Sequence, residues 1–176
     1  SQIMRASRTV LLSAVAAAAV TACATSPLGR SQLKLVSDDE LAQLGVTSFQ
    51  QTSKETPVSS DGRTTAYVNC VARAITDEVG GVWEVRVFES KDVNAFALPD
   101  GKIGVYTGLL AVTKTQDQLA AVIGHEVAHV IAGHSNERVS QQQVTDLGLG
   151  LANVIVGGGA GGGALMSALG VGAQYG

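Results

Sequence analysis

Residues 119–138 read LAAVIGHEVAHVIAGHSNER, and the interpretation of the whole chain starts from this stretch. His125 and His129 are four residues apart, so on a helix their imidazoles lie one turn apart on one face, where both can bind one zinc ion. Glu126 projects about 100° around the helix from His125, where it can take a proton from a zinc-bound water without binding the metal. The spacing predicts His125 and His129 as metal ligands and Glu126 as the catalytic general base.

The alternative is that these three polar residues lie on a solvated helix face. Their neighbours argue against it, because most of the helix is apolar, including Leu119, Val122, Ile123 and Val127. A helix of this composition is largely buried, so its polar side chains need partners inside the fold. We therefore favour a catalytic Zn²⁺ site.

Outward from this helix, local signals predict a mixed α+β domain over residues 37–146. Capping boxes begin helices at Ser37 and Thr115. Pro99-Asp100-Gly101 is a turn between two strand patterns. The expected helices cover residues 37–53, 64–78 and 115–143, and the expected strands cover 83–88, 94–98 and 102–107. We expect a small sheet with one long active-site helix.

The helix GHEVAHVIAGHSNERVS, preceded by NAFALPDGKIGVYTGLL, resembles the HtpX and CAAX-prenyl-protease family of gluzincin zinc metallopeptidases. The resemblance covers about residues 37–140 and is closest to secreted bacterial lipoprotein members of that family. It implies a zincin-like fold and endopeptidase activity on membrane-associated or misfolded proteins. It also implies an edge strand that pairs with an extended substrate, formed by Lys102, Ile103, Gly104, Val105 and Tyr106. An interior strand is the alternative for this stretch.

The chain departs from the gluzincin pattern after His129. Gluzincins take a third zinc ligand from a later helix, within a Glu-x-x-x-Asp-like pattern, and this pattern does not follow here. The later acidic residues are Glu137, two turns beyond His129 on the same helix, and Asp146. Asp146 could fold back towards the metal, but we expect the third ligand to lie beyond Gly176, so that the domain is incomplete at its carboxyl end.

His134 and Arg138 follow the metal-binding motif closely. On an unbroken helix His134 points about 180° away from His125. We therefore expect it to pack or form a hydrogen bond near the site rather than bind the metal. Arg138, one turn further on, is expected to form a structural ion pair.

The amino-terminal segment has the order of a lipoprotein export signal. Two arginines precede the apolar run of residues 10–20, which is too short to span a bilayer. Val20-Thr21-Ala22-Cys23 resembles a lipobox, so residues 4–22 are expected to be removed and Cys23 to be lipidated. Ordinary signal cleavage beside an incidental cysteine is the alternative. Residues 23–36 then form a tether, and by resemblance to Gram-negative lipoproteins Ala24 favours the outer membrane.

Composition limits the partners. The formal net charge is −3, so we expect no nucleic-acid binding. Residues 147–176 form an apolar segment in which six of the seven residues from 157 to 163 are Gly, and two short helices around a flexible linker fit it best. Cys70 is expected to be a small buried residue. The leading function is a zinc-dependent endopeptidase of the bacterial cell envelope, and the alternative is a non-catalytic lipoprotein that binds client proteins as a chaperone.

Overall fold

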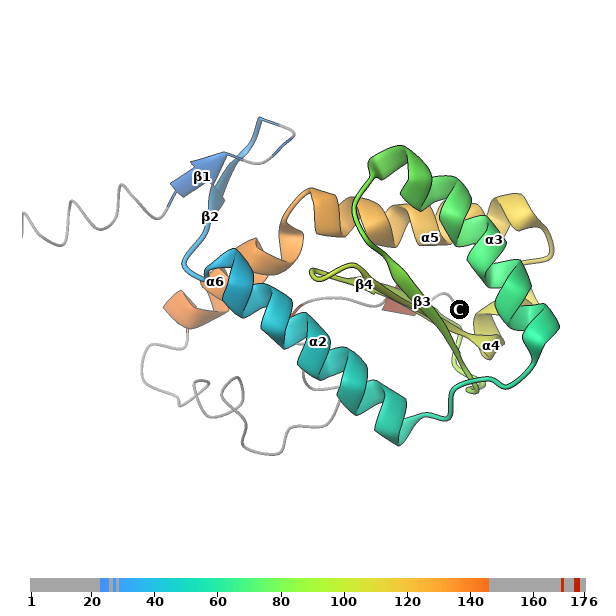
Figure 1. The fold of residues 1–176 in the computed structure, drawn as a ribbon. Helices are drawn as coiled ribbons and strands as arrows, with labels where there is room; N and C mark the ends of the chain where they lie inside the picture. The colour runs from blue at the N-terminus through green and yellow to red at the C-terminus, as the bar shows by residue number, and fades with distance from the viewer. Residues whose placement is uncertain (1–22, 26, 28, 146–168, 170–172, 175–176) are drawn as a thin grey trace, which may run out of the picture.

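The computed structural model describes residues 23–25, 27, 29–145, 169 and 173–174, and it has the expected α+β architecture (Figure 1). Helices lie on both sides of a small mixed sheet. In chain order the elements are β1 (Cys23–Thr25), β2 (Ser31–Leu33), α2 (Asp38–Glu55), α3 (Gly62–Val79), β3 (Glu84–Phe88), β4 (Asn94–Leu98), β5 (Lys102–Tyr106), α4 (Thr107–Val112), α5 (Gln116–Ile131), α6 (His134–Thr145) and β6 (Ala173–Gln174).

The main sheet has the strand order β3-β5-β4-β6. Strand β5 pairs in parallel with β3 and antiparallel with β4, with Val105 opposite Val87 on one side and Ala95 on the other. Strand β6 pairs with β4 at Asn94 and Ala95. The prediction that residues 102–106 form an edge strand is therefore wrong, because both sides of β5 are occupied; β5 is the interior strand of the alternative interpretation.

The buried side chains of the sheet pack in two clusters, one on each face. On one face, Ala97, Ile103 and Val105 pack with α3 and α5. On the other, Phe88 and Phe96 pack edge-on against Phe49 of α2, with ring centroids about 6 Å apart. These aromatic rings attach α2 to the sheet, so that β4 lies between α2 and the helix that carries the metal-binding motif.

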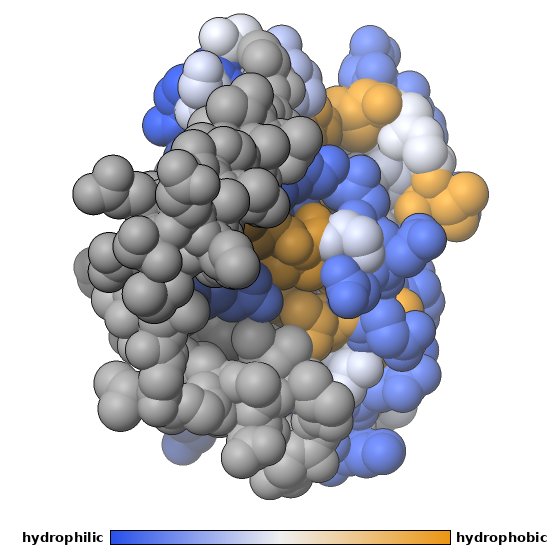
Figure 2. All heavy atoms as spheres, turned by 90° about the vertical axis from the view of Figure 1, so that its left-hand side faces the viewer, coloured by the Kyte–Doolittle hydropathy of each residue, from blue (hydrophilic) through white to orange (hydrophobic). Residues whose placement is uncertain are grey.

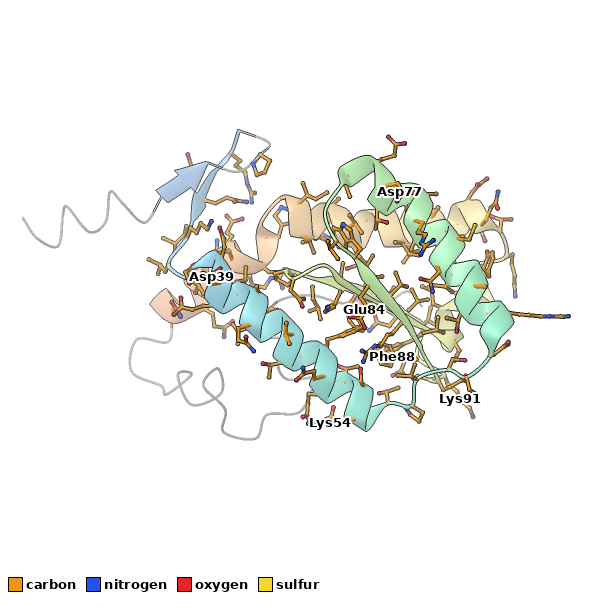
Figure 3. All side chains as sticks on the ribbon, in the orientation of Figure 1. Asp39, Lys54, Asp77, Glu84, Phe88 and Lys91 are labelled. Carbon is orange, nitrogen blue, oxygen red and sulfur yellow. The ribbon has the colours of Figure 1, made fainter. Side chains whose placement is uncertain are left out.

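The ends of α2 follow from local sequence. Ser37 and Glu40 form the predicted capping box, and the first turn is acidic. Lys54 lies in the last turn, where a positive charge complements the helix dipole. Figure 3 shows Asp39 and Lys54 at opposite ends of this helix, with Phe88 of β3 between the sheet and α2.

Several local expectations differ from the structure. The helix predicted to run from Thr115 to Gln143 is broken between Ile131 and His134, and Gly133 has a positive φ of 71° there. Helix α4 was not expected from the sequence. Cys70 is exposed rather than buried, because α3 turns Val71 and Ala72 towards the core instead.

The segment interpreted as a tether contacts the domain. Strands β1 and β2 form a hairpin, and β2 lies against α6. Gln32, Val36 and Asn136 are buried at this contact. The predicted signal peptide and most of residues 147–176 lie outside the described residues, although Leu169 is buried in the α2 side of the core. No helix within the described part of the chain is long and apolar enough to cross a membrane.

Candidate metal centre

Helix α5 is positioned by its first turn and by its apolar face. The Thr115 side chain accepts a hydrogen bond from the main-chain N–H of Gln118, which completes the predicted capping box. Leu119, Ile123 and Val127 are almost fully buried against the sheet and α3. Because these residues repeat at intervals of four, they fix the rotation of the helix about its axis, and with it the directions of His125 and His129.

The structure brings the two predicted metal ligands together. His125 Nε2 and His129 Nε2 are 2.9 Å apart, and the rings are nearly perpendicular, at 82°. Zinc binds imidazole nitrogen at about 2.0–2.1 Å, so both nitrogens can reach one ion placed between them. His125 is exposed and His129 is half-buried, which leaves the site open to solvent on the His125 side.

Glu126 lies between these histidines in sequence but is directed inward. Its side chain is only 3% exposed, in contrast to the exposed His125 beside it. A carboxylate in such a place is screened from bulk solvent, which strengthens its interactions with charge that develops nearby. This position is compatible with a general base at the border of the metal site.

The helix break brings His134 back to the metal site. His134 Nδ1 lies 2.6 Å from His129 Nδ1, and the ring centroids are 4.9 Å apart. The prediction that His134 forms a hydrogen bond near the site is confirmed. The 180° separation that we derived from an unbroken helix is wrong, because Gly133 turns the chain by adopting a left-handed conformation.

The environment of His129 favours its neutral form. Desolvation lowers the pKa of His129, and the charges of His125, His134 and Arg138 lower it further. A neutral imidazole is the form that binds a metal ion, so a lowered pKa reduces competition by protons. Arg138 is exposed and acts on His129 through its charge.

The described residues contribute two histidines but no complete metal-binding set. No group of three or more His, Cys, Asp or Glu residues able to hold a metal occurs among them. Glu137 forms an ion pair with Arg30. Asp146, the other candidate ligand, lies outside the described residues. The two convergent imidazoles fit a divalent ion whose coordination is completed by another group.

A separate hollow lies beside the helix break. Its volume is about 270 Å³, and its lining combines Leu33 of the hairpin, Leu41 of α2, Pro99, and Val130 and Ile131 of α5. Figure 2 shows the side of the molecule with β1, β2 and α6, where apolar residues are visible between polar ones. His125, Glu126 and His129 do not line this hollow.

Comparison with known proteins assigns the chain to a protein family. The model of peptidase family M48 matches residues 59–171. The chain belongs to peptidase family M48. The match confirms the resemblance to zinc metallopeptidases found in the sequence and includes α3, all strands of the main sheet up to β5, and the helix with the metal-binding motif. Membership of M48 implies a divalent metal.

Named M48 relatives share this part of the chain. Mitochondrial metalloendopeptidase OMA1 of Arabidopsis thaliana is 39% identical over 121 residues, which are 66% of this chain and 25% of the relative. Metalloprotease LoiP of Escherichia coli is 33% identical over 108 residues, 61% of this chain and 40% of the relative. The β-barrel assembly-enhancing protease of Escherichia coli is 25% identical over 119 residues, 66% of this chain and 24% of the relative. The chain thus spans about a quarter of the length of the OMA1 relative.

Proposed function

We propose that this protein is a zinc-dependent endopeptidase that hydrolyses peptide bonds in protein substrates. The observation that carries the proposal is the 2.9 Å approach of His125 Nε2 and His129 Nε2, with Glu126 between them in sequence. Two convergent imidazoles and an adjacent carboxylate are the components of metal-assisted hydrolysis. Membership of family M48 supports the same reaction.

The residues divide the chemistry between them. His125 and His129 would hold a divalent metal, which when bound would supply Lewis acidity that lowers the pKa of water and polarises a carbonyl. Glu126 accepts the proton of the attacking water and then donates it to the leaving amine. Its burial keeps that proton from exchanging freely with bulk solvent.

The substrate side of the proposal does not rest on an edge strand. Strand β5 is interior, and Phe96, Ala97 and Leu98 of β4 are at most 1% exposed, so their main chain is not open to an incoming peptide. We propose misfolded or membrane-associated proteins as the substrates, as the resemblance to this family of peptidases implies.

We place the protein in the bacterial cell envelope, anchored to the periplasmic face of the outer membrane through lipid on Cys23. The support is the order of two arginines, an apolar run and the lipobox-like Val20–Cys23.

The test of catalysis is Glu126→Gln in the full-length protein. The amide keeps the size of the side chain but cannot accept the proton, so cleavage of an unfolded protein substrate should fall by about 10²–10⁴-fold. Zinc content, measured by atomic absorption, should stay at the wild-type value. Undiminished cleavage by this variant would remove Glu126 from the mechanism.

A non-catalytic role is the second candidate, because only two metal ligands lie within the described residues. A binding module of this kind would suppress aggregation of an unfolded client without cutting it. The discriminating measurement follows client length by gel electrophoresis during an aggregation assay with zinc-loaded wild-type protein. Shortened client supports the peptidase, and intact soluble client supports the binding module.

A further inference from the structure

We propose that His134 is a positioning residue for the metal site: it accepts a hydrogen bond from Nδ1–H of His129 and so fixes the tautomer and ring orientation of that ligand. The inference rests on the proposed metal site but not on proteolysis. Sequence spacing alone placed His134 on the opposite side of the helix.

The two nitrogens of His129 have different neighbours. Nε2 faces His125 Nε2 at 2.9 Å, and Nδ1 faces His134 Nδ1 at 2.6 Å. An imidazole that binds a metal through Nε2 carries its proton on Nδ1. The hydrogen bond to His134 is therefore a donation from His129, and His134 must present an unprotonated Nδ1. Its own proton is then on Nε2.

This geometry also separates His134 from the metal. The metal position lies between His125 and His129, on the Nε2 side of the His129 ring, whereas His134 contacts the opposite nitrogen. Histidine ligands of metal sites usually donate their second N–H to a carboxylate, a carbonyl or water, and loss of that partner commonly reduces metal affinity. In this chain the neutral imidazole of His134 is the acceptor for the second N–H of His129.

The backbone around the helix break holds His134 in position. Gly133 N–H donates to Val130 O, and Glu137 N–H donates to Gly133 O, so the turn is closed on both sides of the glycine. Gln32 of the hairpin donates its side-chain amide to Ala132 O at 2.7 Å. This bond satisfies a carbonyl at the end of α5 that has no following helical turn.

A second set of buried hydrogen bonds attaches α6 to the amino-terminal segment. Asn136 donates to Val36 O at 2.8 Å, and Ser140 Oγ donates to Asn136 Oδ1. Leu35 N–H in turn donates to Ser140 Oγ. Asn136 and Ser140 are 4% and 0% exposed, so these bonds are protected from water. The start of α6, and therefore His134, is held from both sides of the break.

The experiment compares His134→Leu with His134→Asn in the full-length protein. Asn keeps a side-chain oxygen close to the position of Nδ1 and can accept the bond, whereas Leu cannot. Zinc affinity, measured by competition with a chromogenic chelator, should fall by about 10–100-fold in His134→Leu. It should stay within a few-fold of wild type in His134→Asn. Wild-type affinity in the Leu variant would overturn the proposal, as would an equal loss in both variants.

Two controls keep the result interpretable. Thermal unfolding of the metal-free proteins identifies a variant that fails to fold. A second measurement needs no variant: long-range ¹H–¹⁵N correlation spectra of the zinc-bound wild type should show a proton on Nδ1 of His129 and on Nε2 of His134. A proton on Nδ1 of His134 at neutral pH would refute the acceptor role. If the wild type binds no zinc at all, the proposed function fails first.

Discussion

Asp100, in the turn between β4 and β5, shows how one charged residue is accommodated in this domain. Neither of its carboxylate oxygens has a hydrogen-bond partner of good geometry among the described residues, and its side chain is 9% exposed. Burial raises the pKa of Asp100, and the Lys102 ammonium, 4.0 Å away, opposes that shift. The folded state therefore binds the Asp100 proton more tightly than the unfolded state does.

Replacing Asp100 by Asn should stabilise the protein at neutral pH. A raised pKa means that the charged carboxylate costs stability above the folded-state pKa, and this cost disappears as the pH falls to the ordinary value of 3.8. Asp100→Asn should raise the free energy of unfolding by about 1 kcal/mol at neutral pH, because a buried charge whose oxygens lack hydrogen-bond partners is removed. Urea unfolding at several pH values should show that the difference in free energy of unfolding between variant and wild type decreases as the pH is lowered. A constant difference would contradict this origin.

At the scale of elements, the two glycines that flank the metal-binding motif differ in backbone conformation and in the space available for a side chain. Gly124 lies inside α5, where an added Cβ would meet only Ile75 Cδ1 at 3.9 Å, an ordinary contact. Gly133 has a φ of 71° at the break, and an added Cβ would lie 3.3 Å from the Gln32 side chain. One position tolerates a side chain and the other does not.

We expect alanine to have opposite effects at these two glycines. Gly124→Ala should stabilise by about 0.5–1 kcal/mol, because alanine is the better helix former. Gly133→Ala should destabilise by about 1–2 kcal/mol, because a left-handed conformation is costly for residues with a Cβ. Each variant is the control for the other in the same denaturant titration. Equal effects would mean that the break does not depend on the conformation of Gly133.

At the scale of the whole molecule, the amino-terminal segment joins the proposed anchor to the site. Cys23 begins β1, and the chain from Ser31 to Val36 lies along α6 through buried hydrogen bonds. A protein anchored through Cys23 would therefore be held close to the membrane, with little free chain between lipid and domain.

Cys23→Ser should release the protein from membranes into the soluble periplasmic fraction, because the proposed acyl chains on Cys23 would supply the membrane affinity. Cell fractionation followed by immunoblotting measures this directly. Cys70→Ser is the matched control, since Cys70 is exposed on α3 and should leave the distribution unchanged. If the Cys23 variant stays with the outer membrane, the anchor lies elsewhere, with residues 147–176 as the first alternative.

Much of the fold could be predicted because its signals are local. Capping boxes at Ser37 and Thr115 mark helix starts that the structure confirms, and strand β4 has the predicted bounds. The spacing of His125 and His129 sets their proximity on any helix, so the two metal ligands were identifiable from the sequence. A helix start or an interval of four residues depends on neighbours within one turn.

Sequence by itself thus determined the α+β class, the helix that carries the motif, and the pair of convergent histidines. Only the tertiary structure decided that β5 is interior and that His134 reaches His129. Strand order depends on pairing between distant segments, and the β3–β5 contact is parallel, so no adjacent hairpin reveals it. The position of His134 depends on left-handed Gly133 and on a hydrogen bond to the neighbouring Ala132 carbonyl from Gln32, about a hundred residues earlier, which no local pattern could show.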